Sequence, residues 1–171
     1  LALALAGGCG RFGTEPPLEE SGGAHICARQ VTEGDLFSFG AGDTVNRSGY
    51  DAEVVKVELL DAVGMELVGA KVVYYSTREP SGNDLSVGLL GGWPPDFGDA
   101  ALEAEFERAD DLEGAVIPPD EDTAASFVVG VRVTQGAQTG PLRLTYRAGG
   151  RQWTWTGGIT FRTAKGKTCD D

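Results

Sequence analysis

Apolar and polar residues alternate in short runs from about residue 27 onward, and this period of two is typical of half-buried β-strands. In one run, Lys71, Val73 and Tyr75 share one face of the expected strand, and their neighbours share the other. The clearest runs are 55–59, 67–75, 127–133, 142–147 and 159–162. No stretch keeps the helical period of 3.6 beyond about two turns, so the pattern favours strands throughout.

Segments rich in Gly, Pro and Asp separate the runs and predict turns. The sequence Ala-Gly-Gly-Arg at 148–151 predicts a tight hairpin, and 40–43 and 135–141 predict looser turns. Residues 101–107 alternate three apolar residues with three Glu, although Ala, Leu and Glu are also good helix formers. Because the alternation is strict, we predict a strand at 101–107.

About seven strands at this spacing predict an all-β fold, and the first choice is a two-sheet, immunoglobulin-like sandwich. A small β-barrel is the alternative. The cysteines and tryptophans lack the Cys–Trp–Cys spacing of true immunoglobulin domains. We expect a single domain over residues 27–171, which 171 residues in total and 41% hydrophobic content can support.

The N-terminus differs from the rest of the chain. Residues 1–8 are Leu, Ala and Gly only, and Cys9 follows them. Residues 5–9 resemble a bacterial lipobox, in which small residues precede a Cys that receives lipid. Leu5 stands four places before Cys9 instead of the usual three, with Ala6 in its place. The resemblance implies a signal-peptide remnant at 1–8, lipid attachment at Cys9 and an exported, membrane-anchored lipoprotein.

Two other fates are open for this segment. Ala4-Leu5-Ala6 matches an ordinary secretory cleavage site, which would release a soluble chain that starts at Gly7. The segment can also be an unprocessed apolar tail, too short to span a bilayer. Residues 9–26 are dominated by Gly, Pro, Ser and Glu, and we expect them to form the linker between the anchor and the domain.

The chain has three cysteines, Cys9, Cys27 and Cys169. If Cys9 carries lipid, the other two form an even pair, and an exported protein can oxidise them. A Cys27–Cys169 disulfide would close a loop of about 140 residues, which the chain-entropy argument values at up to about 5 kcal/mol. Two free thiols are the alternative.

Charge narrows the possible partners. The net charge is −12, so a phosphate backbone would be repelled and nucleic acid is not an expected partner. Anionic lipid headgroups would be repelled as well, so any membrane attachment must come from something other than basic patches. An unidentified protein or carbohydrate ligand is the remaining expectation.

Candidate catalytic and metal residues are few. His25 is the only histidine, which excludes a multi-histidine metal site within one chain; in an extended strand it would share a face with Cys27. We expect no metal and no cofactor. Acidic residues cluster at 103–113 and 120–122, and we expect them to form a solvated surface. Calcium binding is one alternative, and glycoside hydrolysis by paired carboxylates is the other.

Aromatic residues supply the best surface candidates. Trp93 and Phe97 lie in a segment stiffened by Pro94-Pro95, and they would either plug the core or form a contact patch for a partner or sugar. Trp153 and Trp155 share a strand face, where core packing is favoured over ligand stacking.

The sequence therefore predicts a non-catalytic binding or interaction module, anchored to the extracytoplasmic face of a membrane. Its domain resembles the small β-sandwich lipoproteins of bacterial envelopes. An envelope hydrolase that uses acidic residues is one alternative function, and a structural or assembly protein of the envelope is the other.

Overall fold

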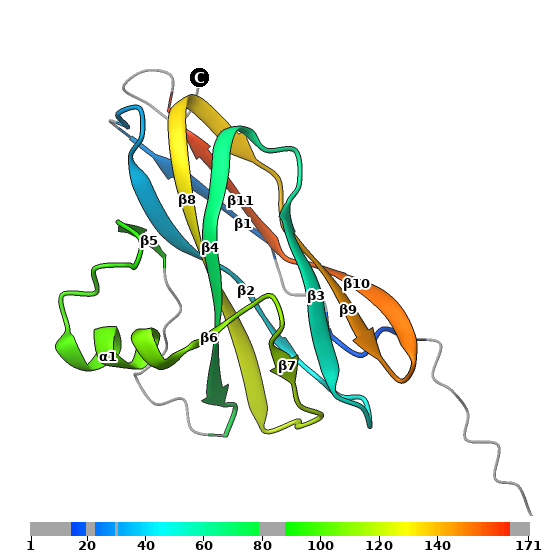
Figure 1. Cartoon of the computed structure of the whole chain (residues 1–171). Helices are drawn as coiled ribbons and strands as arrows, with labels where there is room; N and C mark the ends of the chain where they lie inside the picture. The colour runs from blue at the N-terminus through cyan, green and yellow to red at the C-terminus, as the bar shows by residue number, and fades with distance from the viewer. Residues whose placement is uncertain (1–14, 20–22, 30, 79–87, 165–171) are drawn as a thin grey trace, which may run out of the picture.

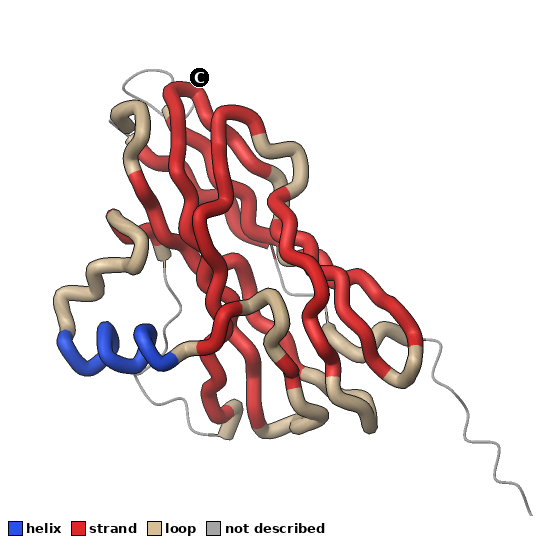
Figure 2. The backbone as a smooth tube through the Cα atoms, in the orientation of Figure 1, coloured by secondary structure: helices blue, strands red, loops and turns tan. Residues whose placement is uncertain are grey.

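The computed structural model describes residues 15–19, 23–29, 31–78 and 88–164, in which eleven strands and one short helix form a β-sandwich (Figures 1 and 2). The larger sheet contains β1 (Gly23–Ala28), β2 (Leu36–Val45), β4 (Val63–Ser76), β5 (Leu89–Gly91), β6 (Asp110–Asp111), β8 (Thr123–Thr139) and β11 (Gly158–Thr163). The smaller sheet contains β3 (Ala52–Leu59), β7 (Val116–Ile117), β9 (Leu142–Ala148) and β10 (Arg151–Thr156). The predicted all-β sandwich is confirmed, with more strands than the seven expected.

Strand β8 is the centre of the larger sheet. It pairs antiparallel with β2 on one side and β4 on the other, and near its end with β11. The alternation predicted for 127–133 is confirmed, because Phe127, Val129, Val131 and Val133 face the core and are fully buried. The intervening Val128 and Gly130 lie on the outer face of the sheet, where a second layer of residues covers them.

The core lies between the two sheets and contains most of the large aromatic side chains. Phe39 stacks on Phe161 with ring centroids 5.4 Å apart, and Phe127 meets Trp155 edge to face at 4.9 Å. Burying a side chain of this size contributes about 1.5–3 kcal/mol relative to leaving it in water. Trp155 is 1% exposed and Trp153 is partly buried against the same cluster, so the pair packs on the core as favoured above.

Of the three predicted turns, the hairpin turn at 148–151 is confirmed, whereas those at 40–43 and 135–141 lie largely within strands. Gly149 and Gly150 join β9 to β10 with φ of 56° and 74°, values that glycine adopts without strain. The turn predicted at 40–43 is instead a bulge inside β2, where the register against β8 shifts between Gly40 and Gly42. β8 likewise continues to Thr139 through most of the turn predicted at 135–141.

The strand predicted at 101–107 is wrong, because Ala100–Arg108 form helix α1. Asp99 caps the helix, since its carboxylate accepts hydrogen bonds from the backbone N–H groups of Ala101 (2.8 Å) and Leu102 (3.2 Å). Phe106 is the only residue of α1 that is fully buried, Glu103 and Glu107 are exposed, and most residues of the helix have high helix propensity.

The folded domain begins earlier than residue 27. Leu18 is 2% exposed in the main core, and its N–H donates to the Tyr146 hydroxyl at 3.3 Å. The carbonyl of Glu19 accepts from the Trp155 indole N–H (2.5 Å) and from the Thr44 hydroxyl (2.9 Å). Leu18, Glu19 and residues 23–26, expected in the linker, are therefore part of the domain. The end of the sequence at 165–171 lies outside the described residues.

Candidate functional site

A second hydrophobic cluster covers the outer face of the larger sheet. Its fully buried members are Val73 of β4, Phe106 of α1 and Val128 of β8. Leu90, Trp93, Phe97, Leu102 and Ala109 pack around these three. The cluster explains why the segment 92–109 lies against the sheet instead of extending into water, since each aromatic side chain removes apolar surface from solvent.

Trp93 occupies a slot that two glycines create. A methyl group added to Gly130 of β8 would lie 2.2 Å from the Trp93 ring, and one added to Gly69 of β4 would lie 2.5 Å from it. The indole also meets the Phe106 ring edge to face at 5.5 Å, and Phe97 lies 5.7 Å from the same ring. Trp93 and Phe97 are both partly buried, so they plug the outer face and keep some exposed surface. Whether that surface contacts a partner stays a prediction.

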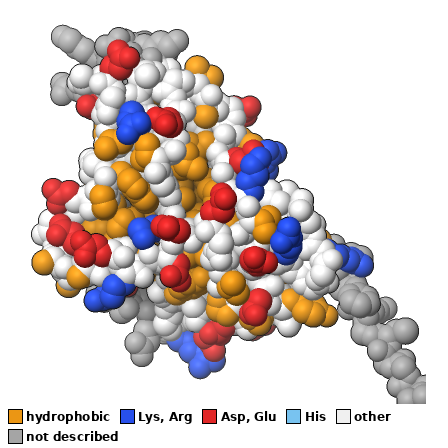
Figure 3. All heavy atoms as spheres, viewed as in Figure 1, with side chains coloured by type: hydrophobic (Ala, Val, Ile, Leu, Met, Phe, Trp, Pro, Cys, Tyr) orange, Lys and Arg blue, Asp and Glu red, His pale blue; other side chains and the backbone are white. Residues whose placement is uncertain are grey.

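Beside Trp93, a groove of about 390 Å³ runs between β4 and β3. Its apolar and small lining residues are Val57, Leu67, Val68, Gly69, Ala70 and Trp93. Val68 has no partner in the register of β8, because the pairing shifts between Leu67 and Gly69, and this bulge adds Val68 to the groove lining. In the space-filling view, apolar surface crosses the same region between α1 and β3 (Figure 3). We call this feature the β3–β4 groove.

Three charged residues complete the lining of the β3–β4 groove, namely Lys71, Asp111 and Glu113. The Lys71 side chain is 20% exposed and its ammonium is already engaged, since it donates to the Ala109 carbonyl at 2.6 Å and lies 3.5 Å from the Asp111 carboxylate. The Asp111 side chain is 85% exposed. The groove is therefore lined by apolar side chains from β3, β4 and Trp93, and charged side chains, two of them acidic, border it.

Open strand edges border the groove on both sides. On the side of β4 away from β8, pairing within the described residues is limited to β6, opposite Lys71 and Val72, and to a bond from the Leu112 N–H to the Ala70 carbonyl. On the side of β3 away from β9, pairing ends at Val54, which bonds to Gly114 and Ala115 at 2.9 Å each. The edges at 55–59 and 65–69 have no paired strand in the described part of the chain.

The segment between α1 and β8 closes the remainder of this side of the sandwich. Residues 110–117 begin as β6 on the larger sheet and end as β7 on the smaller one (Figure 1). The chain itself thus bridges the two sheets directly beside the groove, and the groove is the part of the gap that it leaves uncovered.

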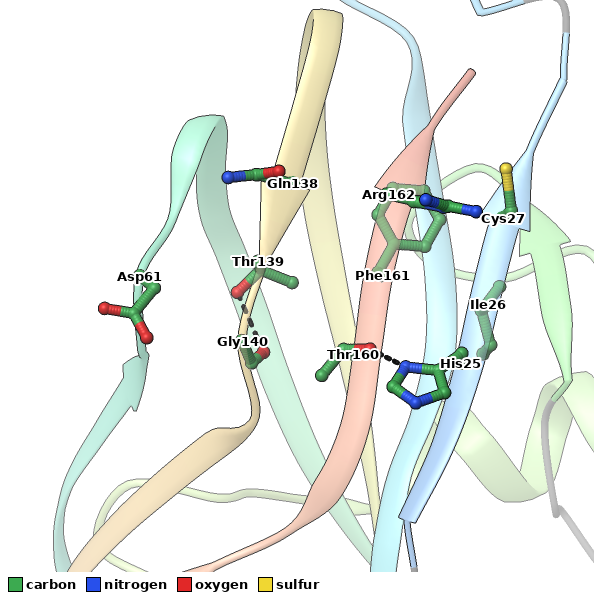
Figure 4. A pocket seen from close by; sticks show the side chains of 10 residues that line it. All are labelled: His25, Ile26, Cys27, Asp61, Gln138, Thr139, Gly140, Thr160, Phe161 and Arg162. Atoms are coloured by element: carbon green, nitrogen blue, oxygen red, sulfur yellow. Dashed lines mark hydrogen bonds between the residues drawn. The ribbon is translucent and has the colours of Figure 1, made fainter. Parts of the chain in front are cut away.

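A second cavity, of about 540 Å³, lies beside the parallel strands β1 and β11, which are the first and last strands of the domain (Figure 4). His25 and Cys27 both line it from β1, as expected for alternate residues of an extended strand, together with Thr160 and Arg162 of β11. The His25 Nδ1 lies 2.5 Å from the Thr160 hydroxyl, which joins the two parallel strands across their exposed face. This contact gives His25 a structural partner.

The acidic clusters have local roles where the structure describes them. Asp120 accepts from the Asp122 N–H (2.9 Å) and from the Thr123 hydroxyl (2.7 Å), and these bonds, the hydroxyl first, hold the pKa of its carboxyl below the usual value. Asp122 pairs with Arg78. Among the described residues, no three His, Cys, Asp or Glu side chains group as metal ligands would.

The remaining predicted site residues cannot be placed together. Cys9, the expected lipid attachment point, and Cys169, the expected partner of Cys27, lie outside the described residues. The groove itself was missed by the sequence analysis. Its one sequence signal is Lys71, a single charge within the apolar run 67–75, which in this fold marks the end of the groove beside α1.

Comparison with known protein families gives no match, and comparison with curated proteins gives none either. Within the part of the chain that the structure describes, no helix is long and apolar enough to cross a bilayer.

Proposed function

We propose that the chain is an exported lipoprotein, held at the extracytoplasmic face of a membrane by lipid on Cys9, whose β-sandwich is a non-catalytic module that binds a partner in the β3–β4 groove. The observation that carries the binding role is a groove of about 390 Å³ that contains several apolar side chains and is bordered by two open strand edges. Contiguous apolar surface with unpaired backbone at its borders is typical of interaction sites.

The position of Leu18 supports a short tether. About nine residues connect Cys9 to Leu18, and an extended chain of that length spans at most about 30 Å. Leu18 and Glu19 are fixed to the core, so a lipid on Cys9 would hold the domain close to the bilayer. The net charge of −12 would keep its surface from adhering to anionic headgroups.

The terminal strands support the proposed Cys27–Cys169 disulfide. β1 and β11 pair in parallel, with Cys27 opposite Arg162, and the Ala164 N–H donates to the Ala28 carbonyl at 2.9 Å. The chain therefore leaves β11 beside Cys27, and the five residues from Ala164 to Cys169 can span up to about 17 Å.

The test of the tether is the intact mass and the location of the mature protein. We expect the wild-type chain in the membrane fraction, starting at Cys9 with a diacylglycerol-sized addition, and a gain of two hydrogens on reduction. Cys9→Ser is expected to move to the soluble fraction. Cys169→Ser is the matched control, and it should stay in the membrane fraction but lose the gain on reduction. A soluble, unmodified chain that starts at Gly7 would overturn the tether.

The test of the groove is site-specific photocrosslinking in the native envelope. A photoreactive residue at Val68 should give a discrete product of one identifiable partner. The same residue at Glu33, an exposed position in the turn before β2, is the control and should not give it. Equal products from the two positions would contradict binding in the β3–β4 groove.

A further inference from the structure

Resting on the binding role proposed above, we propose that the β3–β4 groove takes an extended, basic segment of a partner protein, which adds as a strand to the open edges of β4 and β3. The proposal specifies what the groove recognises, which is a backbone able to pair, alternate apolar side chains and positive charge. Addition of a strand to a sheet edge is an established mode of peptide recognition.

The chain's own residues 110–114 show that these edges accept a strand. Asp110 and Asp111 pair antiparallel with Val72 and Lys71 of β4, and the Leu112 N–H then donates to the Ala70 carbonyl at 2.9 Å. At Gly114 the segment has crossed to the smaller sheet, where its N–H donates to the Val54 carbonyl. An added strand opposite 65–69 would continue the line of β6 along β4.

The groove lining suits alternate side chains of an extended segment. Every second residue of a strand points to the same side, at intervals of about 7 Å. Val57, Leu67 and Val68 give the groove apolar side chains against which those of such a segment can pack. These residues are only partly buried, so a bound segment would remove further apolar surface from water.

The charged residues at the border of the β3–β4 groove favour a basic segment as its ligand. Asp111 and Glu113 border the groove, and Lys71, the one cation there, is already held by the Ala109 carbonyl and by Asp111. The net charge of −12 extends the attraction beyond the groove and would speed the encounter with a cationic segment.

The same charge argues against a second copy of this chain as the occupant. Two copies would bring together two edges that each carry this acidic border, and like charges in contact oppose association.

The test uses the full chain and an acetylated, amidated heptapeptide of alternating Lys and Val as the probe. Binding is measured by fluorescence anisotropy of the labelled peptide, and amide hydrogen exchange of the protein locates it. We expect slower exchange at 65–69 and 55–59 in the bound state. Two matched peptides are the controls: one with Glu in place of Lys, and one with N-methylated backbone on alternate residues. Neither should bind, because one lacks the charge and the other the strand-pairing N–H groups.

Protein variants test the charge. Glu113→Lys is expected to weaken binding about tenfold at low salt, and less at high salt because exposed charges are screened. Glu33→Lys makes the same charge change at a site outside the groove and should weaken binding by at most about twofold. Thermal denaturation checks that both variants are folded.

The strand-addition proposal is overturned if the Lys-Val peptide fails to bind, if the N-methylated peptide binds equally well, or if protection appears outside the two edges. Each of these results leaves membrane attachment through Cys9 untouched, so failure of this inference is distinguishable from failure of the tether.

Discussion

Substitution of Gly130 by Ala should disturb the slot that holds Trp93. The new methyl group would lie 2.2 Å from the Trp93 ring, well inside van der Waals contact, and Gly130 sits in the middle of β8 with strands on both sides. The backbone there cannot yield easily, so the indole must move. We expect Gly130→Ala to push Trp93 partly out of the slot and to loosen the cluster around Phe106.

The magnitude follows from overpacking. Forcing an extra carbon into a filled site costs about 1–3 kcal/mol in the free energy of unfolding. If Trp93 is first replaced by Ala, the slot is empty, and Gly130→Ala then removes only the extra conformational freedom of glycine in a strand. That change stabilises by about 0.5–1 kcal/mol. Gly130→Ala should therefore lower the free energy of unfolding of the wild type and raise that of the Trp93→Ala variant. The coupling energy between the two substitutions should be about 2 kcal/mol or more.

The assay is chemical denaturation of the wild type, the two single variants and the double variant, combined as a double-mutant cycle. Gly49→Ala serves as the control, because no atom lies within 4 Å of its added methyl group. If Gly130→Ala destabilises the Trp93→Ala background as much as the wild type, then the methyl group clashes with something other than the indole, and the slot is refuted.

Three further predictions concern the anchoring of residue 18 and the titration of two buried or paired groups. Leu18→Ala should lower the free energy of unfolding by about 2–5 kcal/mol in chemical denaturation, because Leu18 is 2% exposed in the core. Burial raises the pKa of Tyr146 above its ordinary value of 10, so the unfolded chain loses this proton first and stability should fall as the pH rises above about 10. Tyr146→Phe should make that fall shallower in denaturation curves between pH 9 and 11. Hydrogen bonds from Lys56 and then from Arg143 hold the pKa of Glu58 below its ordinary value of 4.5. Its contribution to stability is thus present above that value and lost at lower pH, and Glu58→Gln should reduce the acid-side loss of stability.

Each of these three has a matched control. Val63→Ala removes an aliphatic side chain that is 57% exposed and should change stability far less than Leu18→Ala; equal losses would place Leu18 outside the core. Tyr50→Phe alters a 52% exposed tyrosine and should leave the fall of stability between pH 9 and 11 unchanged. Glu121→Gln removes an exposed carboxylate and should leave the acid limb as in the wild type. If Glu58→Gln and the wild type lose the same amount of stability at low pH, the role assigned to Glu58 is contradicted.

Strands were predictable where burial alternates strictly along the chain. In β8 the residues 127–133 reach the core at every second position, so the hydrophobic pattern alone defined both faces. Residues 101–107 show the weakness of the same argument, because Leu102 and Phe106 are also one helical turn apart. Over seven residues, alternation and a two-turn helix fit the same pattern, and the structure has the helix, with Asp99 as its cap.

The β3–β4 groove could not be predicted from the sequence, for a different reason. Which strand edge stays open depends on where 110–117 crosses between the sheets, and that path depends on packing over distances that a local pattern does not encode. The slot for Trp93 likewise combines Gly69 and Gly130, which are neighbours only because β4 pairs with β8. The sequence indicates Trp93 and Phe97 as surface candidates, but its alternation places their partner Phe106 in a strand.

The parallel pairing of β1 with β11 determines how the domain would bear mechanical force. Because the two strands run in the same direction, a pull on the N-terminal side of Gly23, opposed by a load at the end of β11, acts along the strands. In this shear geometry all six residue pairs between Gly23–Ala28 and Gly158–Thr163 carry the load together, instead of separating one after another as in a zipper. Under the tether proposed above, a pull from Cys9 would reach this strand pair only after Leu18 and Glu19 had been released from the core.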